Sequence, residues 1–267
     1  MLSVTGASRL VGLIGNPVAH SLSPRMQNAA FAARGLDWAY VPLEVEREGL
    51  EDATAGLVAL GFAGANVTVP HKTAVLAFCD EIDEFAQRAG SANTLVVREG
   101  RVHASSTDGL AVVDAVDAGE ADVLLLGAGG AAQAVATALL DAGAASLVVA
   151  ARRPDAGGAL AARLRTLFPG RDIAGAETWP PDGGRASLLV NATPVRDELP
   201  LAPHERQTVV DLAYRPDGQP TALVTAARGR AVDGLEVLVR QGAASFERWT
   251  GVPAPVDVMR AAVRSAR

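Results

Sequence analysis

Short apolar runs alternate with alanine-rich stretches along the first third of the chain. The runs at residues 10–14, 38–42 and 64–69 have the composition of β-strands, and the stretches at 24–34 and 49–60 have that of helices. Strands that alternate with helices are typical of βαβ units, in which successive strands pair in parallel. This pattern predicts an α/β fold for the first third of the chain.

The same alternation returns in the middle of the chain, where the strands are more apolar. Residues 122–126 form a continuous apolar run, as expected of a strand buried on both faces. The remaining predicted elements are a helix at 131–142, strands at 147–150, 187–190 and 208–212, and closing helices at 234–249 and 255–263. Residues 157–158 and 180–184 are rich in glycine or proline and are interpreted as surface loops.

The change in character near residues 107–114 predicts a boundary between two α/β domains. We expect a substrate-binding domain of residues 1–107 plus 242–267, because the closing helices have no strand partner of their own and can pack back on it. Residues 108–241 are expected to form a doubly wound, Rossmann-type domain. Ligands of such sheets bind at the carboxyl ends of the strands, so substrate and cofactor are expected to meet in a cleft there.

Composition excludes several classes of function. The net charge of −6 and the pI near 5.3 argue against a nucleic-acid or anionic membrane surface. No apolar run is long enough to span a bilayer, and residues 1–9 lack the pattern of a signal peptide, which predicts a cytoplasmic protein. Cys79 is the single cysteine, interpreted as a buried small side chain, and the four histidines lack metal-ligand spacing, so no metal site is expected.

A glycine-rich turn follows the apolar run at 122–126. Gly127, Gly129 and Ala132 fit the dinucleotide pattern G-x-G-x-x-G/A. In this pattern the glycines permit a tight turn and a close approach of the pyrophosphate to the backbone, while the helix N-terminus faces the phosphates. A tight turn without a ligand is the alternative, and the strand before and the helix after the turn argue against it.

The end of the next predicted strand bears on which dinucleotide binds. A site for NAD usually has an acidic residue there, whereas this chain has Ala151, Arg152 and Arg153. Two guanidinium groups suit the 2′-phosphate of NADP. Arginines after a strand can also be merely solvated, and Asp155 keeps NAD open as an alternative. The pattern favours NADP.

Polar residues gather in four segments of the N-terminal half. Ser21 and Ser23 lie on a turn that leads into a helix, where hydroxyls and helix N-terminal amides can bind a carboxylate. Ser23 can alternatively cap the helix, whereas Ser21 has no such structural duty and is the better candidate ligand.

The strand at 64–69 carries further polar groups. Asn66 and Thr68 share one face of it, and Lys72 follows where Pro70 stops the strand. Asn93 and Asp108, from the segments at 90–94 and 105–109, add an amide and a carboxylate, although each could form an ordinary Asx turn.

In this order the segments resemble those of shikimate dehydrogenases. The resemblance covers nearly the whole chain, continuing through 191–194, 211–214, 233–235 and Gln241 to 246–251. Each short motif is weak alone, but the ordered set is specific. It implies an NADP-dependent oxidoreductase that reversibly reduces 3-dehydroshikimate to shikimate in chorismate and aromatic amino-acid biosynthesis.

The resemblance also implies roles for individual residues. Lys72 and Asp108 would form the catalytic pair beside the reacting carbon. The implied substrate-binding residues are Ser21 and Ser23 at the carboxylate, Tyr214 on the carboxylate side, Thr68, Asn93, Asp108 and Gln241 at the ring hydroxyls, Asn66 near them, and Lys72. The implied cofactor-binding residues are Gly127, Ala128, Gly129, Gly130, Ala131, Ala151, Arg152, Arg153, Asn191, Ala192, Thr193, Leu212 and Gly234.

Three departures from the family pattern leave alternatives open. Gln27 stands where the family often has a histidine, Ser106 where it usually has an asparagine, and residues 151–153 replace its asparagine–arginine–threonine. A relative acting on quinate or an amino analogue, also with NAD, is one alternative, and a non-catalytic nucleotide-binding regulator is another. The expected partners are small molecules, with the chain a monomer or a homodimer.

Overall fold

The computed structural model describes residues 4–265 and divides the chain into two compact units. The first unit runs to Thr107 and resumes at Leu238, and the second comprises Asp108–Val237. The second crossing lies inside helix α8 (Gly234–Thr250), whereas the sequence pattern places it after Gln241. Residues 1–3 and 266–267 of the predicted first domain lie outside the described range.

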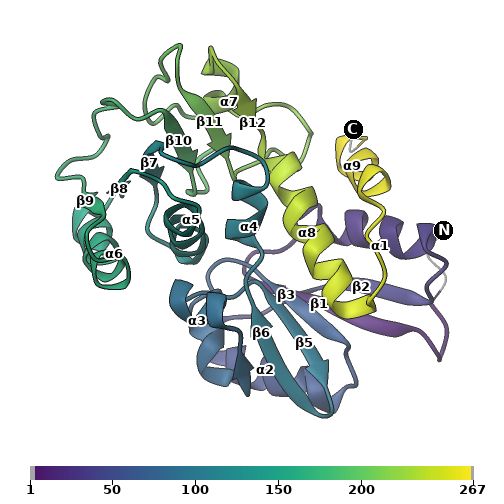
Figure 1. Ribbon diagram of the computed structural model, residues 1–267. Helices are drawn as coiled ribbons and strands as arrows, with labels where there is room; N and C mark the ends of the chain where they lie inside the picture. Colours follow the sequence, from purple (N-terminus) through teal and green to yellow (C-terminus); the bar gives the residue numbers. More distant parts are fainter. Residues whose placement is uncertain (1–3, 266–267) are drawn as a thin grey trace. The chain divides into compact units, whose positions relative to one another are not determined.

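The first unit contains a mixed six-stranded sheet in the order β2-β1-β3-β5-β6-β4 (Figure 1). Its strands are β1 (Arg9–Gly15), β2 (Trp38–Glu44), β3 (Gly64–Val67), β4 (Glu81–Ile82), β5 (Thr94–Arg98) and β6 (Arg101–Ser105). Strand β1 pairs in parallel with β2 and β3, whereas β5 is antiparallel to both β3 and β6. The predicted βαβ pattern therefore holds for β1–β3, and a hairpin follows it.

Helices cover both faces of this sheet. They are α1 (Ser23–Ala33), η1 (Arg47–Gly49), α2 (Leu50–Ala59), η2 (Ala74–Phe78), α3 (Glu84–Ala89), most of α8, and α9 (Val256–Arg264). On one face Phe31 of α1 stacks on Phe246 of α8 with ring centroids 5.4 Å apart. On the other face Leu50 and Leu57 of α2 pack into an aliphatic cluster with Ile14.

The second unit is a six-stranded, wholly parallel sheet in the order β12-β11-β10-β7-β8-β9. Its strands are β7 (Asp122–Leu126), β8 (Ser146–Ala150), β9 (Asp172–Gly175), β10 (Leu188–Asn191), β11 (Thr208–Asp211) and β12 (Ala231–Val232). The chain moves outward from β7 to β9 and then returns to the other side of β7 at β10. This is the doubly wound order, and its switch point lies between β7 and β10.

The helices of this unit lie on both sheet faces. They are α4 (Asp108–Val113), α5 (Gly130–Asp141), α6 (Pro154–Leu167), α7 (Ala222–Ala226) and the start of α8. Along β7, Val123 and Leu125 belong to the cluster beneath α4, α5 and α6, while Leu124 and Leu126 belong to the cluster that includes Leu223 of α7. The prediction of a strand buried on both faces is confirmed.

The interpretation of residues 157–158 as a surface loop is wrong. Both glycines lie inside α6, and Gly157 is buried. A Cβ on Gly157 would come within 3.1 Å of the Val149 carbonyl oxygen, so glycine lets α6 approach β8 closely. The Pro-Gly segment at 180–184 is irregular, as predicted.

All predicted strands and helices occur, with ends that differ by two residues or less. The pattern missed the elements between residues 74 and 113 as well as α6, β9, α7 and β12. Most of these are six residues or shorter, too short for a periodicity to develop.

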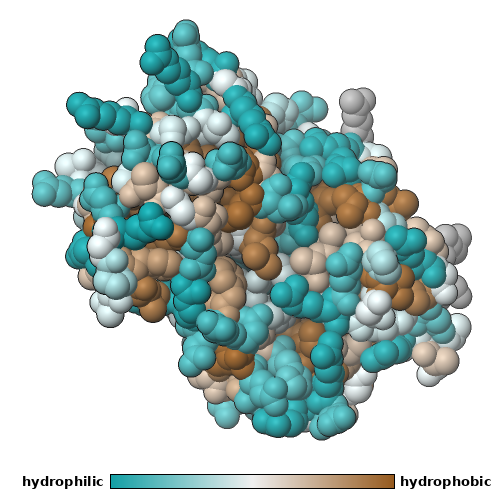
Figure 2. Space-filling view, in the orientation of Figure 1, coloured by the Kyte–Doolittle hydropathy of each residue, from teal (hydrophilic) through white to brown (hydrophobic). Residues whose placement is uncertain are grey.

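Apolar residues on the surface are scattered rather than gathered. On the face drawn in Figure 2 they form several small groups separated by hydrophilic side chains. The exposed large ones, such as Leu60, Val69 and Leu199, come from unrelated segments. Among residues 4–265, no helix combines the length and the apolar character needed to cross a membrane.

Candidate active site

One edge of the first sheet collects the polar residues that the sequence singled out. Strands β1, β3 and β6 end at this edge and β5 begins there, because β5 runs opposite to its neighbours. Ser21 lies in the segment that follows β1, Thr68 and Lys72 follow β3, and Asn93 immediately precedes β5. The sheet topology therefore brings these four positions to one edge.

Hydrogen bonds fix the loops at this edge. The amide of Asn16 donates to the Val69 carbonyl oxygen at 3.0 Å, which ties the loop after β1 to the one after β3. His71 is buried, and its Nε2 lies 2.6 Å from the Val45 carbonyl oxygen. The Ala92 amide donates to the Lys72 carbonyl oxygen at 2.8 Å, so the backbone of Lys72 lies beside that of Asn93.

The two serines have roles that differ from the expectation. Ser23 is the first residue of α1, and no side chain caps this helix. Ser21 instead accepts a hydrogen bond from the Ser23 amide at 3.2 Å, so the expected capping role of Ser23 and the lack of structural duty for Ser21 are both wrong. Ser21 is half-buried and Ser23 is buried. The turn is shaped by Ser21 because its hydroxyl lies two residues before the helix, where it meets an otherwise unpaired amide.

Three polar side chains meet next to these loops. The Asn93 Nδ2 donates to Thr107 Oγ1 at 2.9 Å and to Gln241 Oε1 at 3.1 Å. The Asn93 Oδ1 accepts from the Thr107 amide at 2.8 Å. Asn93 and Gln241 are 148 residues apart in the sequence, yet their side-chain amides are in direct contact. The structure therefore brings together two residues that the resemblance assigns to the substrate.

Asn66 lies in a separate, buried part of this network. Its Oδ1 accepts from the Tyr40 hydroxyl at 2.9 Å, and its Nδ2 donates to the Asn93 carbonyl oxygen at 2.9 Å and to Ser245 Oγ at 3.0 Å. Ser245 also bonds Thr94 Oγ1 at 2.7 Å. The sequence analysis missed Tyr40, Thr94 and Ser245, because their partners lie far away along the chain.

Asp108 is placed by the chain itself. It is the first residue of α4 and follows Thr107, so its Cα lies about 3.8 Å from the Thr107 Cα. Thr107 is buried and held by Asn93 and by the Gln241 carbonyl oxygen, at 3.1 Å from its Oγ1. The polar cluster on the first unit therefore anchors Thr107, the residue that directly precedes Asp108.

Lys72 is the single lysine in the 267 residues, and the other 23 basic residues are arginines. An arginine guanidinium is always charged and does not exchange its proton in catalysis, whereas a lysine amine can. The one lysine thus stands at the edge where the hydroxyls and amides collect. This count is a signal that the sequence alone contains.

In the second unit the glycine-rich turn lies at the switch point of the sheet. Gly127 follows β7 with φ of 114°, and a Cβ there would lie 3.0 Å from the Ala192 carbonyl oxygen in the loop after β10. Gly129 precedes α5 and has open space where a Cβ would be. The first amides of a helix have no intrahelical partner, and no side chain caps those of α5. The turn has the shape and the donors of an anion cradle.

Arg152 and Arg153 follow the adjacent strand β8, and both are exposed. They precede Pro154, the first residue of α6. Ala151 is buried between them and the strand. The two predicted cations are therefore at the carboxyl end of the strand next to the glycine-rich turn.

The other predicted cofactor residues line the same edge of this sheet. Asn191 ends β10, and its Oδ1 accepts from the amide of Thr193 at 3.0 Å, which folds the following loop. Leu212 and Tyr214 follow β11 and are half-buried. Gly234 begins α8, where a Cβ would collide with the Ala213 carbonyl oxygen.

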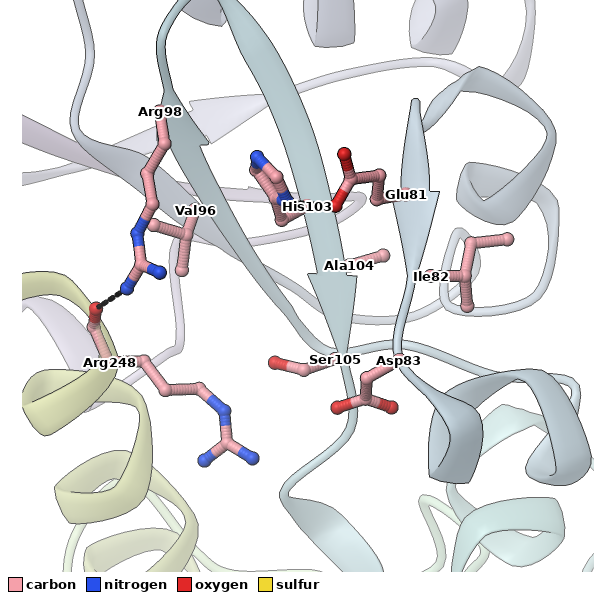
Figure 3. A pocket seen from close by; sticks show the side chains of 9 residues that line it. All are labelled: Glu81, Ile82, Asp83, Val96, Arg98, His103, Ala104, Ser105 and Arg248. Atoms are coloured by element: carbon pink, nitrogen blue, oxygen red, sulfur yellow. Dashed lines mark hydrogen bonds and ion pairs between the residues drawn. The ribbon is translucent and has the colours of Figure 1, made fainter.

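A separate depression of about 280 Å³ lies on the first unit (Figure 3). Its polar lining is already engaged: Arg98 donates to the Arg248 carbonyl oxygen at 3.2 Å, and Glu81 pairs with His103 at 3.0 Å. Asp83 caps α3. None of the predicted site residues lines this depression, and we assign it no role.

Cys79 lies outside the polar edge. Burial raises the pKa of its thiol to about 12, and the charge of Asp80 adds to this effect. The thiol donates to the Val75 carbonyl oxygen at 3.2 Å. It is therefore protonated at neutral pH and unsuited to nucleophilic attack. Within residues 4–265, His, Cys, Asp and Glu side chains do not gather in threes that could hold a metal ion.

Comparison with known proteins identifies the family of the chain. Residues 13–95 match the shikimate dehydrogenase substrate binding domain, and residues 234–264 match the shikimate 5′-dehydrogenase C-terminal domain. The chain is 46% identical to shikimate dehydrogenase (NADP(+)) from Rubrobacter xylanophilus over 97% of each chain.

Solved structures agree with this assignment. Shikimate 5-dehydrogenase from Thermus thermophilus, in complex with NADP(H) and shikimate, superimposes with a TM-score of 0.82 at 34% identity, covering 97% of this chain and all of the other. Quinate dehydrogenase from Corynebacterium glutamicum, in complex with NAD, also reaches 0.82, at 29% identity over 96% of this chain and 98% of the other. The fold is thus shared by enzymes with different substrates and cofactors.

Proposed function

The chain belongs to the shikimate dehydrogenase family, and we propose that it catalyses the reversible, NADP-dependent reduction of 3-dehydroshikimate to shikimate with Lys72 and Asp108 as its catalytic pair. The observation that carries the catalytic assignment is the single lysine of the chain. It stands at the sheet edge where two serines, a threonine and two amides converge. The family assignment supports the substrate and the cofactor.

The chemistry requires a proton donor at this edge. Reduction of a ketone adds a hydride to the carbon and a proton to the oxygen, and the nicotinamide of bound NADPH supplies the hydride. Negative charge builds on the oxygen, so a protonated amine within hydrogen-bond reach lowers the barrier. Lys72 donates this proton from its Nζ and takes it back in the reverse direction. Asp108 accepts a hydrogen bond from the adjacent substrate hydroxyl and orients the Lys72 amine.

The remaining polar residues of the first unit hold the substrate. Ser21 and Ser23 bind its carboxylate, with Tyr214 on the same side, and Thr68, Asn93 and Gln241 bind its ring hydroxyls. The contact between the Asn93 and Gln241 amides supports this assignment, because a hydroxyl can exchange with that bond at little net cost. Both amide atoms of Asn66 are engaged within the protein, so Asn66 acts on the substrate through Asn93.

The second unit fits NADP. Residues 127–131 bind the pyrophosphate, because they include the uncapped N-terminus of α5 and the open space at Gly129. Arg152 and Arg153, after Ala151, bind the 2′-phosphate. Asn191, Ala192, Thr193, Leu212 and Gly234 line the rest of the nucleotide.

Substitution of Lys72 tests the catalytic assignment. We expect both Lys72→Ala and Lys72→Arg to lower kcat at least about 100-fold, because neither side chain can transfer the proton. The affinity for NADP, measured by titration, should stay within about twofold of that of the wild type. Turnover is followed by the absorbance of reduced nicotinamide with shikimate. An arginine variant with wild-type kcat would refute proton transfer by Lys72, since it would show that charge alone is sufficient.

A direct measurement is available because the chain has one lysine. Reductive methylation with ¹³C-formaldehyde would give a single lysine methyl resonance besides that of the N-terminus. Its titration midpoint should match the midpoint of the pH–rate profile for shikimate oxidation. A mismatch of more than about one pH unit would contradict the assignment.

Cofactor choice is tested at the two arginines. Arg152→Ala and Arg153→Ala should each raise KM for NADP about 10-fold or more and leave KM for NAD unchanged, because each removes a charge-assisted hydrogen bond to the 2′-phosphate. Arg185→Ala, at another exposed arginine of the same unit, is the control. Equal effects on NADP and NAD would contradict the assignment.

The alternatives are separated by the same assays. A strong preference for quinate with NAD would make the chain a quinate dehydrogenase. Nucleotide binding without turnover of either acid would indicate the regulator. We propose a cytoplasmic monomer or homodimer, in keeping with a single cysteine and no internal disulfide. Sedimentation of the purified chain measures its oligomeric state.

A further inference from the structure

A buried carboxylate that the sequence left without a role lies behind the nucleotide-binding edge of the second unit. Asp211 ends β11, directly opposite Asn191 at the end of β10. The Asp211 side chain is fully buried, as is that of Asn191. An ionisable group in the interior destabilises the folded state unless several donors satisfy it.

Three donors converge on the Asp211 carboxylate. Its Oδ1 accepts from Asn191 Nδ2 at 2.8 Å and from the Ala213 amide at 2.9 Å. Its Oδ2 accepts from Thr221 Oγ1 at 2.5 Å. Thr221 caps α7, since its side chain accepts from the Val224 amide. One carboxylate thus joins the ends of two strands to the start of a helix.

These bonds determine the conformation of two loops. Asn191, held by Asp211, also donates to the Val195 carbonyl oxygen at 3.2 Å and accepts from the Thr193 amide at 3.0 Å. The loop after β10 is therefore folded around the Asn191 side chain. The bond from the Ala213 amide bends the chain just after β11. Both loops lie at the carboxyl ends of their strands.

The same two loops contact the segments proposed to hold the nucleotide. The Ala192 carbonyl oxygen approaches Gly127 so closely that a Cβ would lie 3.0 Å from it. The Ala213 carbonyl oxygen lies against Gly234, where no Cβ would fit. A shift in either loop would therefore displace the glycine-rich turn or the start of α8.

We propose that Asp211 is a positioning residue for the dinucleotide: its ionised carboxylate holds the loops after β10 and β11 in the shape that NADP requires. This rests on the proposed function of the second unit as the NADP site. Asp211 acts through Asn191 and Ala213 and does not itself touch the nucleotide.

The Asp211 carboxyl changes its protonation state as the pH varies just below neutrality. Burial raises the pKa of this carboxyl to about 6, although the hydrogen bonds from Thr221, Ala213 and Asn191 oppose the rise. The charge of Asp233 raises the pKa further. Arg215, the nearest cation along the chain, is paired with Asp197 and Asp217 at the surface. Asp211 is therefore largely ionised at pH 7.5 and protonated below pH 5.

Asp211→Asn provides a mimic of the protonated form. The amide oxygen can still accept from Asn191 and Ala213, and the amide nitrogen can donate to Thr221 Oγ1. What is lost is the charge, and the stronger hydrogen bonds to a charged acceptor shift the equilibrium between bonded and open loops about fivefold toward the bonded form. Openings that break these hydrogen bonds while Asp211 stays buried should therefore be more frequent in the variant by about this factor.

The first test needs neither ligand nor activity. Hydrogen exchange at pH 8 should be about fivefold faster at the Thr193 and Ala213 amides in Asp211→Asn than in the wild type. Asp172→Asn, an exposed carboxylate at the start of β9, should leave these rates unchanged. Equal rates in wild type and Asp211→Asn would overturn the proposal.

The second test measures nucleotide affinity. The Kd for NADP should rise about two- to fivefold in Asp211→Asn at pH 8. The upper limit is about fivefold, because the apparent affinity cannot fall by more than the change in the equilibrium between closed and open loops. The ratio of variant to wild-type Kd should approach one below pH 5.5, where wild-type Asp211 is protonated as well. Titration of the 2′-phosphate cancels in this ratio. A ratio that is constant with pH would indicate a purely structural defect and overturn the role of the charge.

Steady-state kinetics show whether the substitution affects NADP binding, shikimate binding or turnover. In Asp211→Asn, KM for NADP should rise while KM for shikimate and kcat stay within about twofold. Asp211→Ala, which removes the acceptor altogether, should raise KM for NADP further if it folds. Absence of shikimate oxidation by the wild type would defeat the proposed function, whereas the exchange and Kd measurements would still decide the role of Asp211.

Discussion

Removing the charge of Asp211 should stabilise the folded chain. In the unfolded chain this carboxyl has its ordinary pKa of 3.8, whereas in the folded chain burial raises the pKa to about 6. A raised pKa in an acid means that ionisation costs more in the folded state, so stability is lost as the pH rises through this window. The difference of about 2.2 units corresponds to about 3 kcal/mol at pH 8.

Asp211→Asn avoids this cost, because its side chain stays neutral in both states. The variant should therefore be about 3 kcal/mol more stable than the wild type at pH 8. At pH 5 the wild-type carboxyl is already protonated in the folded chain and the advantage should fall to about 1.6 kcal/mol. The comparison uses the same chain and the same buffer at each pH, so other titrating groups cancel.

Urea unfolding, followed by tryptophan fluorescence and circular dichroism at pH 5, 6, 7 and 8, measures this difference. Coincidence of the two signals would show whether the two units unfold together, and the second unit is the relevant transition if they do not. Asp172→Asn is the control, with an expected change below about 0.5 kcal/mol at every pH. A variant less stable than the wild type at pH 8, or an advantage independent of pH, would refute the reasoning.

Three further substitutions and one reagent test the packing of the first unit. Gly64→Ala should destabilise the chain by about 3 kcal/mol in thermal unfolding, since a Cβ would collide with the Leu95 carbonyl oxygen, whereas Gly56→Ala, in open space within α2, should stabilise it by up to about 1 kcal/mol. Trp249→Phe should cost about 1–3 kcal/mol in urea unfolding, because the indole Nε1 no longer donates to Leu95. A disulfide reagent at pH 8 should modify Cys79 about a thousandfold more slowly in the folded chain than in urea, since its thiol pKa of about 12 leaves little thiolate, and rapid modification would contradict this.

The elements that the sequence predicted are those with enough length to show a period. Residues 122–126 could be assigned as a doubly buried strand because an unbroken apolar run has few other structures. Gly157 misled the prediction, since a glycine pair usually marks a loop. Inside α6 a glycine is needed because a Cβ would crowd the neighbouring strand β8, and this contact cannot be inferred from the sequence.

The candidate site was predictable where chemistry is local and not where it depends on contacts. Ser21 could be chosen as a ligand from its place on a turn, but its bond to the Ser23 amide belongs to the folded backbone. Asn66 and Asn93 look alike in the sequence. Only their hydrogen-bond partners in the structure show that Asn66 is a buried link within the protein, whereas Asn93 lies at the edge of the sheet. Lys72 could have been selected from the count of lysines alone.

Asp211 shows why a residue without an evident role in the sequence can still be tested for one. A neutral asparagine would keep a hydrogen bond to each of the same three partners, with Thr221 accepting in place of donating, and by the argument above it would leave the chain more stable. The carboxylate is therefore unfavourable for folding and is explained by what it does to the loops. If this is right, the loss of NADP affinity in Asp211→Asn must develop as the pH rises through the pKa of about 6, and the gain in stability must level off at that same pH, because above it the carboxyl is ionised in both the folded and the unfolded chain. An affinity change centred at a pH other than the one at which the gain in stability levels off would mean that folding and binding respond to different groups, and the charge of Asp211 would then have no part in positioning the nucleotide.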